Sequence, residues 1–134
     1  EGTKTFLGLH SNGFPNLFIV TGPQGGGGSF NFTDAIDAHA DYLAWLLTTM
    51  RDRGLEIVDV RKEDEEGYAE HCRMADIATA PLRDCLSYYN GHGEAEPGSL
   101  AYYGGRRWNT YKDEAQASLS PYLFGHQSQG LPVD

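Results

Sequence analysis

The first clear pattern in the chain is an unbroken apolar run, Leu-Phe-Ile-Val, at residues 17–20. A continuous run of this kind is typical of a strand that is covered on both faces, as in a parallel sheet. Pro15 can only precede or open such a strand, and Gly22 with Pro23 is expected to end it. The pattern therefore predicts a buried strand over residues 17–21.

This predicted strand runs into a glycine-rich turn, because residues 25–28 are all glycine, and a helical pattern begins near Asn31. In open α/β sheets, a strand, a glycine turn and a helix N-terminus together bind the anionic or polar part of a cofactor. The glycines let the backbone approach a flat ligand where a Cβ atom would collide. Composition alone leaves a second interpretation open, in which the glycine tract is a flexible surface loop.

Residues 31–53 carry apolar positions at three- and four-residue spacing and are predicted to form a helix. Asn31 is placed to cap its first turn, with Asp34 three residues on, and Gly54 is placed to end it. The face expected to pack on the sheet consists of Ile36, His39 or Ala40, Leu43, Leu47 and Met50.

The rest of the pattern predicts a short edge strand at residues 55–60 and a second helix at residues 62–79, ending before Pro81. The side of this helix expected to be buried consists of Tyr68, Cys72, Ala75 and Ile77 or Ala78. Beyond Pro81 we expect only loops and a short strand at residues 100–103. The fold class is therefore α/β, with residues 1–80 ordered as strand, glycine turn, helix, strand and helix, and with residues 81–134 as a loop-rich tail.

The chain has 134 residues and a net charge of −9. This charge argues against nucleic acid or an anionic membrane as a partner, since no basic stripe is available to displace counterions. No apolar run approaches the roughly 20 residues of a membrane span, and no secretory leader is visible, so a cytoplasmic location is expected. Cys72 and Cys85 have no metal or disulfide-scaffold spacing and are expected to be reduced thiols.

No self-contained catalytic apparatus is visible. The five histidines are scattered without metal-ligand spacing, and no serine lies in a nucleophile elbow, so no metal ligand or catalytic residue is assigned. We expect the histidines to face solvent or to be satisfied in the core. The aromatic residues of the tail have two interpretations, ordinary packing or contact with a cofactor. Chemistry that belongs to a bound cofactor would fit this picture.

Four landmarks in order give the chain a resemblance to a known family. They are F-L-G-x-x-x-x-G-F-P-N-L-F-x-x-x-G-P at residues 6–23, A-I-D-A-H-A-D-Y-L at 35–43, S-Y-Y-N-G at 87–91, and Y-Y-G-G at 102–105 with Tyr111. This order resembles the last third of the Baeyer–Villiger monooxygenases. These flavoproteins use FAD, NADPH and dioxygen to insert an oxygen atom beside a ketone carbonyl.

The resemblance implies the C-terminal piece of a flavoprotein with two Rossmann-like dinucleotide-binding domains. Residues 1–80 would end the FAD-binding domain, and residues 81–134 would cover the cofactor and substrate site. By the same resemblance, Gly22 and Pro23 lie near the isoalloxazine ring of FAD. The substrate pocket for the ketone would then be bordered by Gln24, Gly25, Phe30, Asn31 and Phe32. Four glycines in place of bulkier residues suggest an enlarged pocket and a bulky ketone.

The segment at residues 87–98 resembles the family's mobile loop, which folds over the nicotinamide cofactor. Tyr88 replaces the tryptophan of the family pattern S-W-Y-x-G, and Tyr88 and Asn90 are assigned to cofactor contact. The family's glycine-rich FAD and NADPH motifs and its catalytic arginine lie outside these residues. The chain alone is therefore expected to be inactive and to need the remainder of the flavoprotein as its partner.

Two other classes stay open at this stage. One is a flavin monooxygenase that oxidises nitrogen or sulfur centres. The other is an acidic α/β module that binds a small molecule without redox chemistry. Yellow colour and NADPH consumption would exclude the module, and product analysis with a ketone and a thioether would separate the two enzymes.

Overall fold

The computed structural model describes residues 3–25, 31–78 and 106–126. In these residues the order of elements is α1 (Phe32–Asp52), β1 (Ile57–Val60), α2 (Lys62–Ala78), α3 (Arg106–Ser118) and β2 (Tyr122–Gly125). The two strands pair antiparallel, with Ile57 opposite Gly125 and Val60 opposite Tyr122. The described residues thus contain no parallel sheet of the kind that the sequence predicted.

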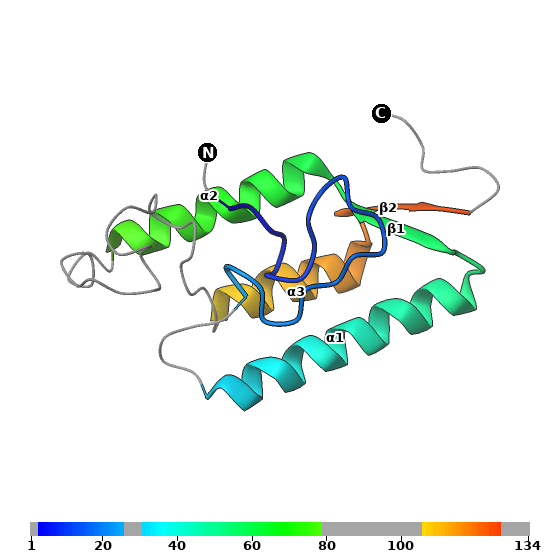
Figure 1. The fold of residues 1–134 in the computed structure, drawn as a ribbon, viewed down its shortest axis with the longest axis horizontal. Coiled ribbons are helices and arrows are strands. Elements are labelled where there is room, and N and C mark those ends of the chain that lie inside the picture. Colours follow the sequence, from blue (N-terminus) through cyan, green and yellow to red (C-terminus); the bar gives the residue numbers. More distant parts are fainter. Residues whose placement is uncertain (1–2, 26–30, 79–105, 127–134) are drawn as a thin grey trace.

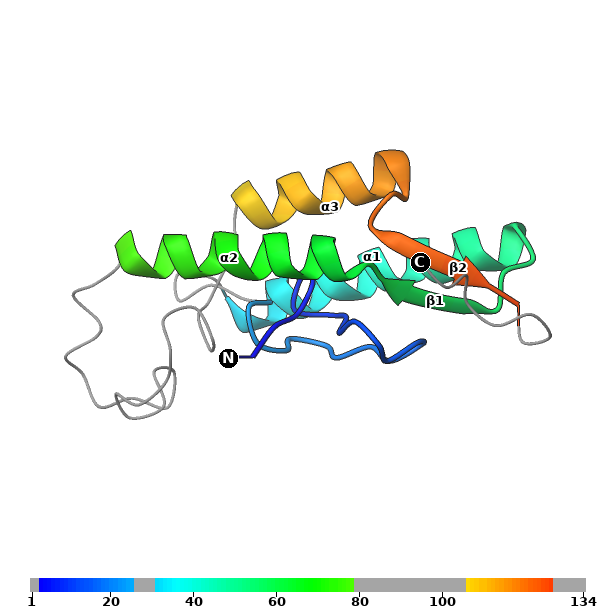
Figure 2. The ribbon, with the colours of Figure 1, turned by 90° about the horizontal axis from the view of Figure 1, so that it is seen from above.

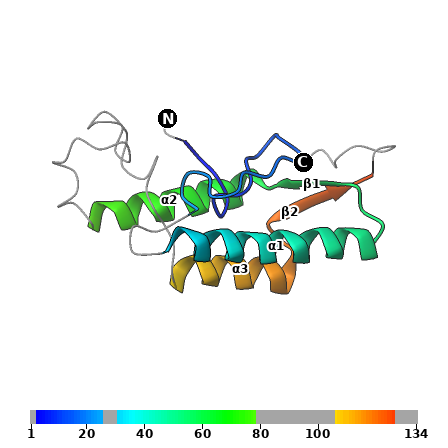
Figure 3. The same cartoon turned by 60° about the horizontal axis from the view of Figure 1, so that its bottom comes forward.

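The elements stack in three levels, with the helices α1 and α2 in the middle. Helix α3 lies on one side of this pair, and the N-terminal segment, residues 3–25, lies on the other (Figure 2). Figure 3 shows the same order from another direction. The two strands lie beyond the C-terminal end of α3 and beside the end of α1 (Figure 1). The N-terminal segment therefore forms one outer surface of the described fold.

Helix α1 confirms its predicted start and stop. Asn31 is its N-cap, and the Asn31 side chain accepts a hydrogen bond from the Thr33 amide at 3.2 Å. At the other end, Gly54 adopts a φ of 67° and donates its amide to the Arg51 carbonyl, as a glycine after a helix commonly does.

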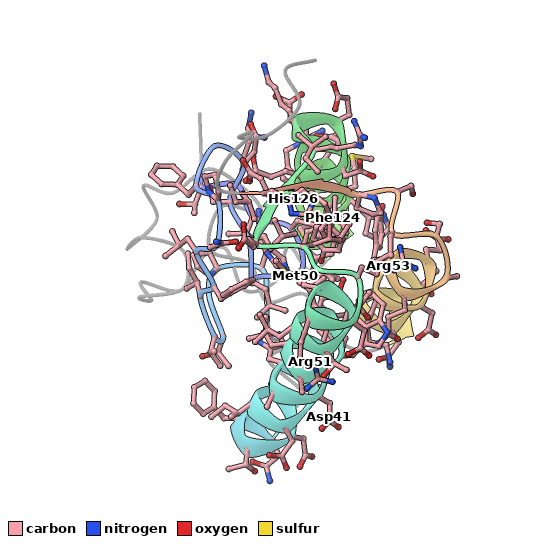
Figure 4. All side chains as sticks on the ribbon, turned by 90° about the vertical axis from the view of Figure 1, so that its right-hand side faces the viewer. Asp41, Met50, Arg51, Arg53, Phe124 and His126 are labelled. Atoms are coloured by element: carbon pink, nitrogen blue, oxygen red, sulfur yellow. The ribbon has the colours of Figure 1, made fainter. Side chains whose placement is uncertain are left out.

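The predicted buried face of α1 is confirmed at His39 and Met50, whereas Tyr42 and Leu46 are buried in place of the neighbouring Leu43 and Leu47. The observed buried face therefore consists of His39, Tyr42, Leu46 and Met50. Leu47, which was expected inside, is 49% exposed. Tyr42 and Leu46 take the inward positions because Tyr42 has both an apolar partner and a buried hydroxyl partner inside the fold. Viewed from the sheet end, Met50 lies near the strands, whereas Asp41 and Arg51 lie farther from them (Figure 4).

The predicted edge strand and second helix are confirmed as β1 and α2. Tyr68 and Cys72 are buried on α2, as expected. Ala75, Ile77 and Ala78 lie in a part of α2 whose side chains are outside the described residues.

The expectation of loops after Pro81 is wrong for residues 106–126, which form α3 and β2. Trp108, Tyr111 and Ala115 recur at three- and four-residue spacing, which is the helical signal. Trp108 and Ala115 are buried against the core. The strand expected at residues 100–103 lies outside the described residues.

The predicted strand at residues 17–21 is also not formed in this chain, since no ladder hydrogen bonds extend along it. Leu17 is 44% exposed and Val20 is 48% exposed, so the run is not covered on both faces. Asn16 and Thr21, at either end, have positive φ values of 60° and 53°. The apolar run lacks the neighbouring strands that a parallel strand needs in order to form.

Individual hydrogen bonds, rather than a third strand, tie the N-terminal segment to β1 and to the first turn of α2. Asn16 pairs with Val58 in both directions, because each amide N–H finds an oxygen of the other residue at 2.9 Å. The Asp59 carboxylate accepts the Gly13 amide at 3.0 Å, and the Glu65 carboxylate accepts the Asn12 amide at 2.9 Å. Both carboxylates are mostly buried and are satisfied by these bonds.

Candidate functional site

The turn at residues 22–25, the candidate cofactor turn, is held by backbone packing among three glycines. A Cβ atom on Gly8 would lie 2.0 Å from the Cα atom of Gly25, and one on Gly22 would lie 2.6 Å from the carbonyl oxygen of Gly8. The Gly22 amide donates to that same carbonyl at 3.0 Å. Glycine is therefore required at Gly8 and Gly22 by the chain's own close approach, whatever ligand lies beyond them.

Gln24 fastens the turn to the N-terminus of the chain. Its amide oxygen accepts the Thr5 backbone amide at 3.0 Å, and its amide nitrogen donates to the Thr3 carbonyl at 3.2 Å. The Tyr68 hydroxyl donates to the Gln24 carbonyl at 2.7 Å, which links the turn to α2. Gln24 is only 2% exposed, so its side chain does not border an open space among the described residues.

His39 supports the turn from α1. The Thr21 amide donates to Nδ1 of His39 at 3.0 Å, so Nδ1 carries no proton and the neutral ring bears its hydrogen on Nε2. The ring stacks on Trp108 of α3, with centroids 5.3 Å apart, and the Trp108 indole donates to the Leu7 carbonyl at 3.0 Å. One histidine thus connects the turn, α1 and α3.

His39 is kept neutral by its surroundings. Burial lowers the pKa of His39 below its ordinary value, and the Gly25 backbone opposes this shift. The Nε2 atom is buried, and among the described residues it has no hydrogen-bond partner within 3.5 Å. Protonation would place a hydrogen on Nδ1 and break the bond from Thr21, so the neutral ring is the form that holds the turn.

A second set of buried polar side chains, Tyr42, Tyr122 and His10, lies between α1, β2 and the N-terminal segment. The hydroxyl oxygens of Tyr42 and Tyr122 are 2.5 Å apart, and the Tyr122 hydroxyl is 3.1 Å from Nε2 of His10. Burial, with a smaller effect from His39, lowers the pKa of His10 to about 3. Burial also raises the pKa of both tyrosines. All three groups are therefore neutral at pH 7, and they fix the relative positions of three distant segments.

The structure describes only some of the residues assigned from the sequence. Gly22 and Pro23 are half-buried, Gly25 is buried, and Asn31 and Phe32 are exposed at the start of α1. Phe32 is 64% exposed. Phe30, Tyr88 and Asn90, the other assigned residues, lie outside the described ones. Sequence reasoning missed Gly8, His10 and Trp108, although Gly8 belongs to the first of the four landmarks.

His10 and His39 are confirmed as core histidines. In the described ranges, no three histidine, cysteine or acidic side chains gather where they would hold a metal ion. No helix within those ranges has the length and apolar character to span a bilayer.

Comparison with curated proteins gives several relatives. The chain is 35% identical over 121 residues to a Baeyer–Villiger monooxygenase of Streptomyces coelicolor. The aligned region covers 81% of this chain and 19% of that protein. It is 33% identical over 132 residues to neopentalenolactone D synthase of Streptomyces avermitilis, and that alignment covers 89% of this chain and 22% of the synthase. No family model matches the chain. The chain spans about a fifth of the length of these relatives.

Solved structures share the fold. The closed form of a cyclohexanone monooxygenase superposes with a TM-score of 0.75 at 24% identity, over 91% of this chain and 23% of that one. A steroid monooxygenase bound to NADP superposes with a TM-score of 0.71 at 24% identity, over 92% of this chain and 23% of that one. Another similar structure contains both FAD and NADP. By sequence and by fold, this chain belongs to the Baeyer–Villiger monooxygenases, of which it represents one part.

Proposed function

We propose that the chain is the C-terminal part of an FAD- and NADPH-dependent monooxygenase that inserts oxygen next to a ketone and yields an ester or a lactone. The observation that carries this proposal is the sequence similarity to two curated enzymes, which extends over 81% and 89% of the chain. In the intact protein, residues 1–80 would complete a Rossmann-like FAD-binding domain, and residues 81–134 would cover the cofactor and substrate.

The turn at residues 22–25 is the part of this chain that we expect to meet the flavin ring. Gly22 and Pro23 remain half-exposed in a turn that is braced by Gly8 on one side and by His39 on the other. A flat ring fits such a turn because it presents mainly backbone. When bound, FAD supplies the redox chemistry and the activation of dioxygen. The residues of the chain supply position, rigidity and exclusion of water.

Helix α1 begins seven residues after this turn and offers the positive end of its dipole. That end favours negative charge on a bound ligand, although Asp34 in the first turn opposes it. We propose that this dipole stabilises the reduced flavin.

We propose that Gly25, Phe30, Asn31 and Phe32 form the substrate side of the site. Gln24 does not contact the substrate but fixes the turn through its hydrogen bonds to Thr5 and Thr3. The exposed ring of Phe32 is available to contact an apolar ketone. The glycines at residues 25–28 remove side chains from this wall, which supports a bulky ketone as substrate. We further propose that the segment at residues 87–98, with Tyr88 and Asn90, covers the nicotinamide of NADPH.

Purification of the full-length protein with its cofactor tests the proposal. We expect the yellow absorbance of FAD, NADPH oxidation that accelerates when a ketone is added, and an ester or lactone as product. A protein that oxidises a thioether or an amine but leaves ketones unchanged would belong to the alternative class of flavin monooxygenase. A colourless protein that leaves NADPH unconsumed would show that the chain is a binding module.

A further inference from the structure

The turn at residues 22–25 follows a residue with a strained backbone. Thr21 has a φ of 53°, in the left-handed region, which a β-branched residue rarely adopts. Such a conformation persists only where the surrounding structure holds it. The Thr21 amide donates to Nδ1 of His39 at 3.0 Å, and the next amide, that of Gly22, donates to the Gly8 carbonyl at 3.0 Å. The position of the turn therefore depends on two supports, His39 and Gly8.

The side chain of Trp108, in α3, reaches both supports. Its indole ring stacks on the His39 ring, with centroids 5.3 Å apart and 27° between the planes. Its indole N–H donates to the carbonyl of Leu7, the residue directly before Gly8, at 3.0 Å. Leu7 also has a positive φ, of 59°, so its backbone requires support as well. One indole thus holds the partners of two consecutive turn amides, across 101 positions of sequence from Leu7.

Trp108 itself is buried, with 5% exposure, whereas Gly22 and Pro23 are partly exposed on the turn. A ligand at the turn would therefore meet these two residues, and the indole would act on it only through them. We propose that Trp108 is a positioning residue for the flavin, because it fixes the turn that meets the isoalloxazine ring. The proposal rests on the proposed function, since that function supplies the flavin.

Two matched substitutions test this role in the full-length protein. The chain has two tryptophans, and the second one, Trp45, lies on α1 and packs on the Tyr42 ring with centroids 5.3 Å apart. Trp108→Phe and Trp45→Phe make the same chemical change. Trp108→Phe keeps a ring against His39 but loses the hydrogen bond to Leu7. Trp45→Phe is therefore the control for loss of an indole elsewhere in the same core.

Hydrogen exchange measured by mass spectrometry shows whether Trp108 holds the turn. We expect the peptide that contains Thr21 and Gly22 to exchange about tenfold faster in Trp108→Phe, the size expected for loss of one buried hydrogen bond. Trp45→Phe should leave that exchange unchanged. Equal exchange in Trp108→Phe and the original protein would overturn the proposal, and so would an equal increase in both variants.

Turnover per bound flavin separates positioning from loss of stability. A tryptophan that only stabilises the fold would lower the melting temperature and the flavin content, but the flavin still bound would turn over at the original rate. We expect Trp108→Phe to lower kcat per bound FAD by between about tenfold and about a hundredfold, since a displacement of about 1 Å can cost a hundredfold. The absorbance maximum of the bound flavin should shift as well, and Trp45→Phe should change neither value.

Trp108→Ala removes the stacking ring together with the hydrogen bond and should have the larger effect. If this variant does not fold, Trp108→Phe decides. Unchanged kcat per bound FAD and unchanged flavin absorbance in Trp108→Phe would overturn the proposal. An original protein that holds no flavin or leaves ketones unchanged would refute the proposed function instead. That failure is distinct, because exchange at the turn shows whether Trp108 holds it without any turnover.

Discussion

The Thr21 amide donates to Nδ1 of His39 at 3.0 Å, across 18 positions of sequence. This bond joins the end of the apolar segment to the inner face of α1, and Trp108 stacks on the same ring. The candidate cofactor turn is therefore supported by a histidine that must stay neutral. Its position depends on the packing of three segments rather than on the turn residues alone.

The acceptor role of His39 and its stacking role are separable by substitution. His39→Phe keeps a ring against Trp108 but leaves the Thr21 amide unpaired, and we expect it to lower the free energy of unfolding by about 1–2 kcal/mol. His39→Asn keeps an acceptor near the Nδ1 position but loses the ring. Denaturant unfolding of both variants measures the two contributions. If His39→Phe were as stable as the original chain, the Thr21 bond would not contribute to stability.

Acid should destabilise the fold through its two buried histidines. The folded-state pKa of His10 is about 3, and that of His39 is also lowered, whereas an exposed histidine titrates near 6.5. The unfolded chain therefore binds more protons below pH 6.5, so stability is fully present above that value and is lost as pH falls toward 3. Each histidine contributes at most about 1.4 kcal/mol per pH unit in this window.

Unfolding midpoints measured between pH 7.5 and 5 check this expectation. The titratable groups that act on His10 are His39 and Tyr122, and the Tyr122 hydroxyl also bonds Tyr42; both tyrosines remain protonated throughout this range because burial raises their pKa. A His10→Gln variant should therefore show a shallower pH dependence. A midpoint that stays constant from pH 7.5 to 5 in the original chain would contradict the buried neutral state of these histidines.

The Tyr42, Tyr122 and His10 group predicts an order of stabilities. Tyr122→Phe removes the bonds to both Tyr42 and His10, and we expect a loss of about 2–3 kcal/mol. Tyr42→Phe leaves the bond between Tyr122 and His10 in place, and we expect a loss of about 1 kcal/mol. Thermal and denaturant unfolding of the two variants give the order. Equal losses would show that the bond to His10 adds nothing.

Substitution by alanine should have different effects at Gly8, Gly13 and Gly67, because the added Cβ atom would clash at Gly8 and would have open space at the other two. Gly8→Ala should prevent folding, since its Cβ would lie 2.0 Å from Gly25 and the φ value is 69°. Gly13 also has a positive φ, of 83°, but has open space around it, so Gly13→Ala should cost only about 1 kcal/mol. Gly67→Ala, inside α2 and also in open space, should stabilise the helix by up to about 1 kcal/mol. Circular dichroism and unfolding of the three variants test this order.

A substitution at Gly22 does not test flavin contact alone, because a larger side chain there would also disturb the fold of this chain. Gly22→Val would clash with the Gly8 carbonyl and with Ile19 inside the chain itself. Loss of flavin in that variant therefore does not by itself prove contact between Gly22 and the ring. A better probe is a variant on the exposed side of the turn, such as Pro23→Ala, because Pro23 is partly exposed to solvent.

Sequence patterns within a segment correctly predicted the helices and strands whose formation depends mainly on interactions inside that segment. Asn31 and Gly54 marked the ends of α1 because capping is a local interaction. The strand at residues 17–21 was predicted wrongly for this chain, because a buried strand forms only beside neighbours that are not among the described residues. Helix α3 was missed although Trp108, Tyr111 and Ala115 carry a helical spacing, since the nearby glycines and aromatics suggested loops.

The candidate site was also predicted only where a residue's role depends on its local sequence. Sequence reasoning identified Gly22 and Pro23 as a turn because their conformational limits are intrinsic. The contacts of Gln24 with Thr5, and of His39 with Thr21, join residues 18 or 19 positions apart and leave no periodic signal. Such contacts become visible only when the chain is folded.

We expect the isolated chain to bind FAD weakly, because the resemblance to the family places the glycine-rich FAD motif outside residues 1–134. Fluorescence titration of FAD with residues 1–134 measures this binding. Weak, non-saturating binding fits a chain that needs the remainder of its flavoprotein. Tight binding at one FAD per chain would show that this part forms a complete flavin site, and the fragment interpretation would fail.

The fate of isotopically labelled dioxygen tests whether the intact protein oxygenates ketones. The full-length protein is supplied with NADPH, a cyclic ketone and ¹⁸O₂, and the product is analysed by mass spectrometry. We expect a lactone that carries one ¹⁸O atom from dioxygen for each ketone consumed. Unchanged ketone, together with NADPH oxidation that does not respond to ketone, would contradict assignment of this protein to ketone oxygenation.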